Sequence, residues 1–284
     1  MIKIDAKKAE ELLSNLNIPA KPKLLEAVHR EYAKSEPDIE TISQIITEDV
    51  ALSASVLKAI NSPVYGLCRS ITDINQSIVF LGLKSLKTIV DCMMLRRTFS
   101  GKASISLERF WDDSVELAQF STIALDFLNL KKQLPAEDLY AAAMFQDCGI
   151  PPMAMRYENY KETLQLANKS VDRPFTLVED ERHSTSHAVV GYFIGTSWYL
   201  PKPLCEYILL HHERTFLELN HLDEHTKQIY AVLKLCENVL HKHKRLTNQA
   251  EWTAIGTSVL EFLTLSEHDY DDIESDILDA YESW

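Results

Sequence analysis

A short polar segment, Gln146–Gly149, is the strongest candidate for chemistry in this chain. It reads Gln-Asp-Cys-Gly and directly follows the apolar run 139–145. The histidines downstream include His183, His187, His211 and His212. Imidazole and carboxylate are the ligands that Mn, Fe and Zn favour, whereas the amide of Gln146 is a poor one. The pattern therefore raises two alternatives, a metal-dependent enzyme or a scaffold that has lost its chemistry.

Helices are expected to position these side chains, because helical patterns cover almost the whole chain. Seven glycines in 284 residues are about a third of the usual ~7% share, and sheets and tight hairpins consume glycine. No segment alternates convincingly like a strand, so the sequence predicts an all-α fold. The expected helices are 7–16, 22–34, 39–47, 50–60, 74–81, a further helix after Gly82, 107–130, 137–145, 157–168, 175–183, 185–199, 202–212, 224–243, 251–263 and the acidic tail.

Several helix ends are marked by specific residues. Asp49 and Asp73 are expected to cap the helices that follow them. Gly82 is expected to end the helix begun at residue 74. Pro151 and Pro152 predict a turn directly after the Gln-Asp-Cys-Gly segment.

The chain is long enough for one large core or two modest ones. The polar stretch Ser100–Ser104 is the best candidate for a boundary between two helical halves. We therefore expect an N-terminal helical subdomain, residues 1–103, and a second helical subdomain, residues 104–284.

Charge is distributed unevenly along the chain. The formal net charge is −13, and residues 1–100 carry 13 Lys and Arg against 12 Asp and Glu, so the acidic excess lies in residues 101–284. Long-range electrostatics should therefore not attract nucleic acid or an anionic membrane. A local basic patch around Arg96 and Arg97 stays open. The acidic tail, residues 266–284, keeps an apolar rhythm that predicts an amphipathic helix.

The lack of a membrane-spanning run, a signal peptide and a CxxC pair indicates where the protein is located and whether its cysteines are reduced. No apolar run approaches the ~20 residues that span a bilayer, and the first residues lack the apolar core of a signal peptide. The five cysteines show no CxxC pair and are expected to be reduced and mostly buried. We expect a cytoplasmic protein.

Several motifs in order give a more specific indication. They are Asn61–Leu67, Ile71–Ile74, Ser77-Ile78, Leu81–Leu83, Phe110-Trp111, Phe145–Gly149, His187–Gly191, Trp198–Pro201 and His211-His212. This set resembles the signature of the HDOD family over roughly residues 12–213. The resemblance implies an all-helical fold, in which an HD-like bundle follows an extra helical subdomain. It also implies a bacterial signalling or regulatory module, related to metal phosphohydrolases but with incomplete catalytic motifs.

The resemblance also assigns site positions. Asp113 stands where the first HD histidine is expected, and Gln146 replaces the motif histidine. The bridging carboxylate is retained as Asp147, and Glu237 stands where the relatives often have a final aspartate. His187, His211 and His212 match histidines of the phosphodiesterase relatives. The residual metal-ligand candidates are therefore Asp113, Asp147, His187, His211, His212 and Glu237.

Each of these residues also has a purely structural interpretation. Asp147 is well placed to hydrogen-bond a helix end. His211 and His212 are adjacent, so on a helix they point about 100° apart, with one buried and the other solvated. His183 and His187 are four residues apart, but the sequence between them resembles a helix start, which argues against a shared face.

A second site is expected near the N-terminal signature. Asn61 is a candidate helix terminator in a left-handed conformation, with Tyr65 and Leu67 in the core. Alternatively, this loop contributes to a ligand or partner cleft at the junction of the subdomains. Asn61, Tyr65 and Arg69 would supply its polar groups.

Two functions from different classes follow. The first is a non-catalytic signalling module that binds a signalling protein or a small anionic ligand. The second is a metal-dependent phosphohydrolase or phosphodiesterase that acts on a nucleotide, which needs ligands for two cations ~3.5–4 Å apart. Because two imidazoles are missing, the sequence favours the first. It predicts no cofactor; if a metal binds, we expect Fe, Mn or Zn.

Overall fold

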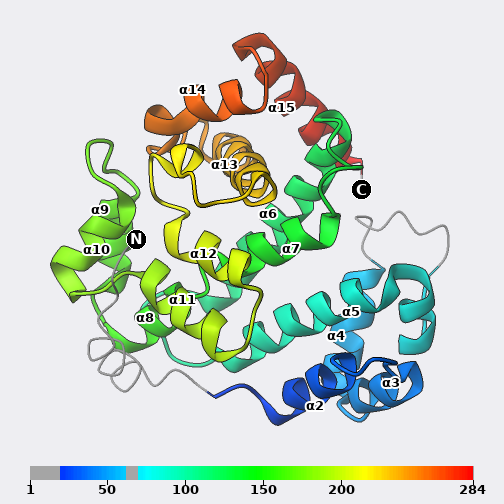
Figure 1. The fold of residues 1–284 in the computed structure, drawn as a ribbon. Coiled ribbons are helices and arrows are strands. Elements are labelled where there is room, and N and C mark those ends of the chain that lie inside the picture. Colours follow the sequence, from blue (N-terminus) through cyan, green and yellow to red (C-terminus); the bar gives the residue numbers. More distant parts are fainter. Residues whose placement is uncertain (1–19, 62–69, 284) are drawn as a thin grey trace. The chain divides into compact units, whose positions relative to one another are not determined.

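Most helices in the part of the chain that the structure describes form close to the predicted positions; the helix at Ile150–Arg156 was not predicted. The structure is a computed structural model, and it describes residues 20–61 and 70–283. No strand occurs in these residues, so the all-α fold class is confirmed. The described residues divide into two units (Figure 1): an N-terminal unit, residues 20–100, and a C-terminal unit, residues 101–283.

The N-terminal unit contains four described helices. They are α2 (Lys23–Tyr32), α3 (Ile39–Thr47), α4 (Val50–Ile60) and α5 (Ile74–Thr98). Helices α2, α3 and α4 all pack on α5. Asp49 caps α4 by accepting the Leu52 amide at 2.9 Å, and Asp73 caps α5 by accepting the Gln76 amide at 2.8 Å. Both predicted caps are confirmed.

Gly82 interrupts α5, as the sequence predicts. Its φ of 78° and ψ of 162° are non-helical, and the helical backbone resumes directly after it. A Cβ at this position would meet nothing within 4 Å. The backbone conformation, rather than crowding, therefore requires glycine.

Asn61 ends α4 by a different means from the predicted left-handed turn, which was wrong. Its φ is −80° and its ψ is 5°. The side-chain amide instead donates to the Ile71 carbonyl and accepts the Ile71 amide, both at 2.7 Å. Asn61 thus links the end of α4 to the backbone of Ile71, which precedes α5. The other two candidates for a ligand cleft, Tyr65 and Arg69, lie outside the described residues, and that cleft stays a prediction.

The C-terminal unit is the larger one. Its α-helices are α6 (Leu107–Phe127), α7 (Ala136–Phe145), α8 (Ile150–Arg156), α9 (Tyr160–Ala167), α10 (Phe175–His183), α11 (His187–Ser197), α12 (Lys202–Leu210), α13 (Glu224–Arg245), α14 (Trp252–Phe262) and α15 (Glu267–Glu282). A short 3₁₀ turn, η2 (Phe216–Glu218), lies between α12 and α13.

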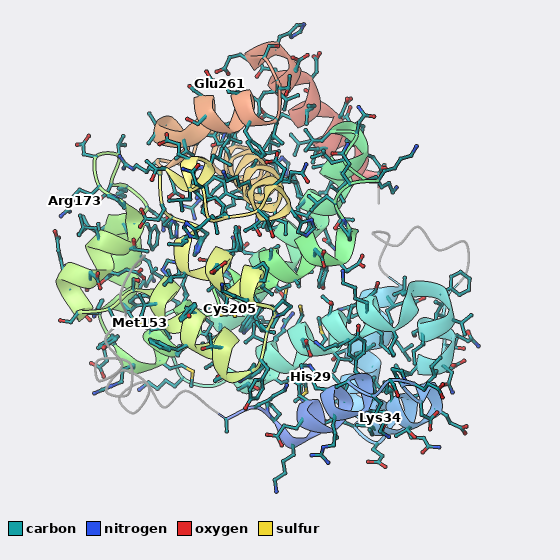
Figure 2. The ribbon with its side chains drawn as sticks, in the orientation of Figure 1. His29, Lys34, Met153, Arg173, Cys205 and Glu261 are labelled. Atoms are coloured by element: carbon teal, nitrogen blue, oxygen red, sulfur yellow. The ribbon has the colours of Figure 1, made fainter. Side chains whose placement is uncertain are left out.

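Helix α13 is the centre of this unit. It packs against α6, α7, α12 and α14 (Figure 1). Its fully buried side chains include Tyr230, Leu233 and Cys236. Helix α6 also contacts α7 and α15, and α11 lies against α12. Buried side chains such as Met153 and Cys205 fill the layer around α8, α11 and α12 (Figure 2).

The two prolines that follow the Gln-Asp-Cys-Gly segment lie in a helix, so the predicted turn was wrong. Pro151 and Pro152 occupy the first turn of α8. An N–H in a first helical turn has no intrahelical acceptor, so proline costs nothing there. The chain therefore continues from α7 through residues 146–149 directly into α8.

Two other sequence-based expectations can be compared with the described residues. Cys92, Cys148, Cys205 and Cys236 are free and buried, as expected, whereas Cys68 lies outside the described residues. Arg97, named as part of a local basic patch, pairs with Asp49 at 2.6 Å. In the described part of the chain, every helix is too short or too polar to cross a bilayer.

Candidate metal centre

Asp147 lies between two helices that hold it in place. Helix α7 ends at Phe145 with Gln146 as its C-cap, and α8 begins after Gly149. A Cβ on Gly149 would lie 2.0 Å from the His187 carbonyl oxygen. Glycine is therefore required for α8 to approach the start of α11. This contact brings the Asp147 carboxylate, whose side chain is 31% exposed, next to His187.

His187 is the first residue of α11, and its ring is fully buried. Its Nδ1 donates to Glu179 Oε2 at 2.7 Å, and its backbone amide donates to the same oxygen at 3.2 Å. Glu179 is also fully buried, and its other oxygen accepts the Tyr160 hydroxyl. These bonds fix the ring and leave its Nε2 facing Asp147.

His211 and His212 both turn into the same site, so the prediction that one of them is solvated was wrong. They are 1% and 8% exposed. Helix α12 ends at Leu210, and His211 is its C-cap. His211 Nδ1 donates to the Ile208 carbonyl at 2.8 Å, and His212 Nδ1 donates to Glu251 Oε1 at 2.9 Å.

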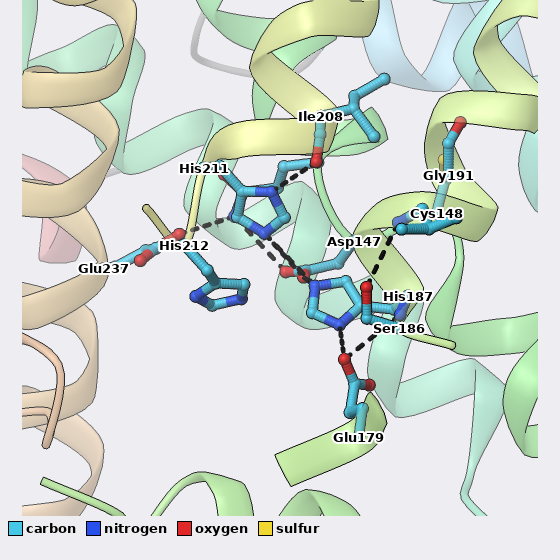
Figure 3. A network of polar contacts seen from close by, with 12 residues as sticks. Asp147, Cys148, Glu179, Ser186, His187, Gly191, Ile208, His211, His212 and Glu237 are labelled. Atoms are coloured by element: carbon cyan, nitrogen blue, oxygen red, sulfur yellow. Dashed lines mark hydrogen bonds and ion pairs between the residues drawn. The ribbon is translucent and has the colours of Figure 1, made fainter. Parts of the chain in front are cut away.

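The ligand atoms of Asp147, His187, His211 and His212 converge within 4.8 Å of one another. Asp147 Oδ1 lies 3.2 Å from His187 Nε2 and 3.5 Å from His211 Nε2 (Figure 3). The two Nε2 atoms are 3.3 Å apart. Because each of the three rings already donates from Nδ1, each neutral ring presents a bare Nε2 lone pair. The Asp147 carboxylate and these Nε2 atoms are then all acceptors that face one another, which is unfavourable unless a cation or added protons lie between them.

The electrostatics of the cluster agree with this geometry. Burial alone would lower the pKa of His187, but the carboxylates of Glu179 and Asp147 outweigh it and raise this pKa to about 10. Burial lowers the pKa of His212 to about 3, although Glu251 opposes the shift. Burial would raise the pKa of Asp147, yet hydrogen bonds from His187 and His211 hold it well below its usual range. The cluster thus favours positive charge between its ligand atoms.

Gln146 is fixed beside the cluster and faces it with a donor. It is 1% exposed. Its Oε1 accepts the Tyr207 hydroxyl at 2.6 Å, and its Nε2 donates to Glu237 Oε1 at 2.7 Å. The same Nε2 lies 3.4 Å from Asp147 Oδ2. An amide N–H group cannot bind a metal, so in this orientation Gln146 supplies no ligand atom.

The other two predicted ligands, Asp113 and Glu237, line the same cleft as Asp147 without joining the converging group. Asp113 is on α6, where it pairs with Lys244 at 2.6 Å. Glu237 is on α13 and pairs with Lys234 at 3.1 Å. Among the described residues, neither belongs to the converging group of four. His183 is also separate, because it ends α10 and contacts Thr163 Oγ1 at 2.8 Å.

Three site residues escaped the sequence analysis. Glu179 orients His187, Glu251 holds His212, and Lys234 contacts both Glu237 and Glu251. Glu179 and Lys234 lie on helices with several similar charged residues, and Glu251 directly precedes α14. No local pattern distinguishes these three, so only the tertiary fold identifies them.

A cleft of about 620 Å³ opens onto the cluster. Asp147 and His212 line it together with Gln146 and Glu237. Apolar side chains from several helices also line it: Phe110, Leu117, Leu164, Phe175 and Leu240. Phe175 stacks on the His212 ring at 4.8 Å between centroids. This volume is in the ~300–1,000 Å³ range of small-molecule sites.

Basic side chains also line this cleft, although the chain as a whole is acidic. They are Arg109, Lys161, Lys244 and Arg245. Lys244 pairs with Asp113 and Glu116. The other three are exposed and form no ion pair within the described residues.

The fold and the cluster define an all-helical protein with an HD-like His/Asp site. The HDOD domain model matches residues 18–214, and the chain belongs to this family. The family resemblance seen in the sequence is therefore confirmed.

Three solved structures share the fold. An HDOD domain protein of unknown function from Geobacter sulfurreducens is 20% identical with a TM-score of 0.65, and 96% of each chain is covered. A proposed metal-dependent phosphohydrolase from Shewanella amazonensis is 17% identical with a TM-score of 0.65, covering 96% of this chain and 98% of that one. A proposed signal transduction protein from Marinobacter aquaeolei is 14% identical with a TM-score of 0.66, covering 95% of this chain and 60% of that one.

One curated relative also matches. An uncharacterized protein from Treponema pallidum is 21% identical over 253 residues, which cover 88% of this chain. The chain spans 46% of the length of that relative.

Proposed function

We propose that this chain is a regulatory module that binds one divalent transition metal and a small anionic ligand, and that it does not hydrolyse phosphate esters. Membership of the HDOD family and the fold shared with a proposed signal transduction protein support the regulatory role. The observation that carries the metal is the convergence of one ligand atom from each of Asp147, His187, His211 and His212 within 4.8 Å of one another. In this respect the proposal departs from the sequence-based prediction of no cofactor.

The donor set fits one metal ion. Three imidazoles and one carboxylate within 4.8 Å of one another suit Zn, Fe or Mn in a four-coordinate site. The contact between Glu179 and His187 supports this, because metal-binding histidines almost always donate their other N–H to a carboxylate, carbonyl or water. Charge supports it as well, because the network holds the carboxylates of Asp147, Glu179, Glu237 and Glu251 against the single ammonium of Lys234.

The same site lacks what two-metal hydrolysis requires. A second cation ~3.5–4 Å from the first needs further His or carboxylate ligands. Gln146 offers an N–H in that direction, and its oxygen is taken by Tyr207. Asp113 pairs with Lys244 outside the group of four. We therefore infer binding without turnover.

The cleft supports a small anionic ligand. Arg109, Lys161 and Arg245 provide positive charge along a cleft that leads to Asp147 and His212. Arginine and lysine in such a position attract carboxylate and phosphate groups. Binding of a signalling protein, the other partner class predicted from the sequence, stays a prediction.

A nucleotide phosphohydrolase is the second candidate. One relative of the same fold has been proposed to be a metal-dependent phosphohydrolase, and the cleft accommodates a ligand of nucleotide size. The experiment below distinguishes the two functions.

The test combines metal analysis with a hydrolysis assay on the purified full chain. We expect one equivalent of Zn, Fe or Mn per chain and no hydrolysis of bis(p-nitrophenyl) phosphate with added Mn²⁺. Hydrolysis that depends on His211 would establish the phosphohydrolase instead, with His225→Ala as the matched control, since His225 pairs with Asp138 away from the cluster. Absence of metal, even after incubation with each ion, would contradict the proposed metal centre.

A further inference from the structure

Lys234 is a buried cation beside the metal centre. Its side chain is 1% exposed on α13. Its Nζ donates to Glu251 Oε2 at 2.9 Å and to Glu237 Oε2 at 3.1 Å. It also lies 5.9 Å from the centroid of the Tyr230 ring. A lysine is almost never fully buried unless it is paired, so this one is held by two carboxylates.

The same two carboxylates face the metal cluster with their other oxygens. Glu237 Oε1 accepts from Gln146, the neighbour of Asp147. Glu251 Oε1 accepts from Nδ1 of His212, one of the four converging residues. Lys234 is thus linked to His212 through Glu251, and to Asp147 through Glu237 and Gln146. A continuous polar network runs from Gln146 through Lys234 to His212.

Glu237 and Glu251 come from separate segments and bind the same cation, the Lys234 ammonium, as two carboxylate ligands of a metal ion would. Glu237 comes from α13, and Glu251 directly precedes α14. Carboxylates brought together in this way bind a divalent ion when no other cation neutralises them. An ammonium on the same chain neutralises them permanently, because it cannot dissociate into solvent.

We propose that Lys234 is a built-in cation that takes the place of a second metal and so limits this centre to one. The inference rests on the proposed one-metal function. It names the residue that keeps a regulatory site from becoming a two-metal site. It also predicts that restoring a histidine at Gln146 is not sufficient to add a metal.

The test measures bound metal per chain in four proteins. Wild type and Gln146→His are each expected to bind one equivalent of Mn²⁺ or Zn²⁺ by elemental analysis and calorimetric titration. Lys234→Met combined with Gln146→His is expected to bind one equivalent more than wild type. Lys242→Met is the matched control, because Lys242 lies on the same helix and pairs with Glu274, and it should leave the count unchanged.

A thermal melt keeps the test decisive if the lysine variant is unstable. Without metal, the Lys234→Met protein should melt well below wild type, and added Mn²⁺ should restore more of its Tm than it adds to wild type. Changing Glu237 and Glu251 to Gln as well should abolish that extra gain. If the lysine variants gain no metal, or if Mn²⁺ fails to rescue an unfolded variant, the role of Lys234 is wrong.

The two proposals fail separately in this experiment. A wild type without metal would overturn the proposed metal centre. A gain of one equivalent on removing Lys234 would still support the role of that lysine.

Discussion

At the scale of single residues, the site depends on which atom each side chain presents. Each histidine of the cluster donates from Nδ1 to a protein acceptor: Glu179, the Ile208 carbonyl or Glu251. Gln146 presents an N–H instead of a lone pair. With Gln146 in this orientation, the proposed centre would hold one cation through Nε2 atoms, and Gln146 would offer no ligand to a second one.

Glu179→Gln tests the orientation of His187. The amide loses the negative charge that supports the ring, so we expect the affinity for Zn²⁺ to fall by about 10–100-fold. Competition with a chromophoric chelator measures this affinity. Glu181→Gln on the same helix is the control, because Glu181 is exposed and pairs only with Arg173 among the described residues. Equal affinities in the two variants would contradict the role of Glu179.

At the scale of elements, close backbone contact assembles the cluster. The start of α8 lies against the first residue of α11, and only a residue without a side chain fits between them. Gly191 on α11 is similarly confined, since a Cβ there would lie 2.8 Å from the Ile208 side chain. His211 and His212 follow directly after α12, which ends at Leu210, and both belong to the converging group.

Gly149→Ala tests this packing. The added methyl group would collide with the His187 carbonyl, so the two helices must separate. We expect a loss of about 1–3 kcal/mol in the free energy of unfolding in urea, together with weaker metal binding. Met155→Ala on the same helix removes a side chain that is 43% exposed and should cost under about 0.5 kcal/mol. Wild-type stability in Gly149→Ala would refute the close approach.

At the scale of the whole molecule, the sequence predicts the helices better than the site. Caps such as Asp49 and a break such as Gly82 are local signals, so the helix bounds follow from them. The predicted helix at 175–183 matches α10. The four ligands were also foreseen as candidates. Their convergence depends on long-range packing, and so do the roles of Glu179 and Lys234, which no local pattern reveals.

Removal of metal tests how the centre contributes to the fold. A ligand that binds only the folded state at 100 times its Kd stabilises that state by about 2.7 kcal/mol. We therefore expect a chelator to lower the Tm of the chain by roughly 5–10 °C. His211→Ala should already have the lower Tm and should not respond to the chelator. A Tm that is insensitive to chelation in wild type would argue against a bound metal.

The most direct test of the central claim is anomalous diffraction from crystals of the full chain, recorded at the absorption edge of the metal found by elemental analysis. The proposed centre predicts one peak, surrounded by Asp147, His187, His211 and His212, with the Lys234 ammonium between Glu237 and Glu251. No peak at these four residues, or a second peak between those two glutamates, would contradict it.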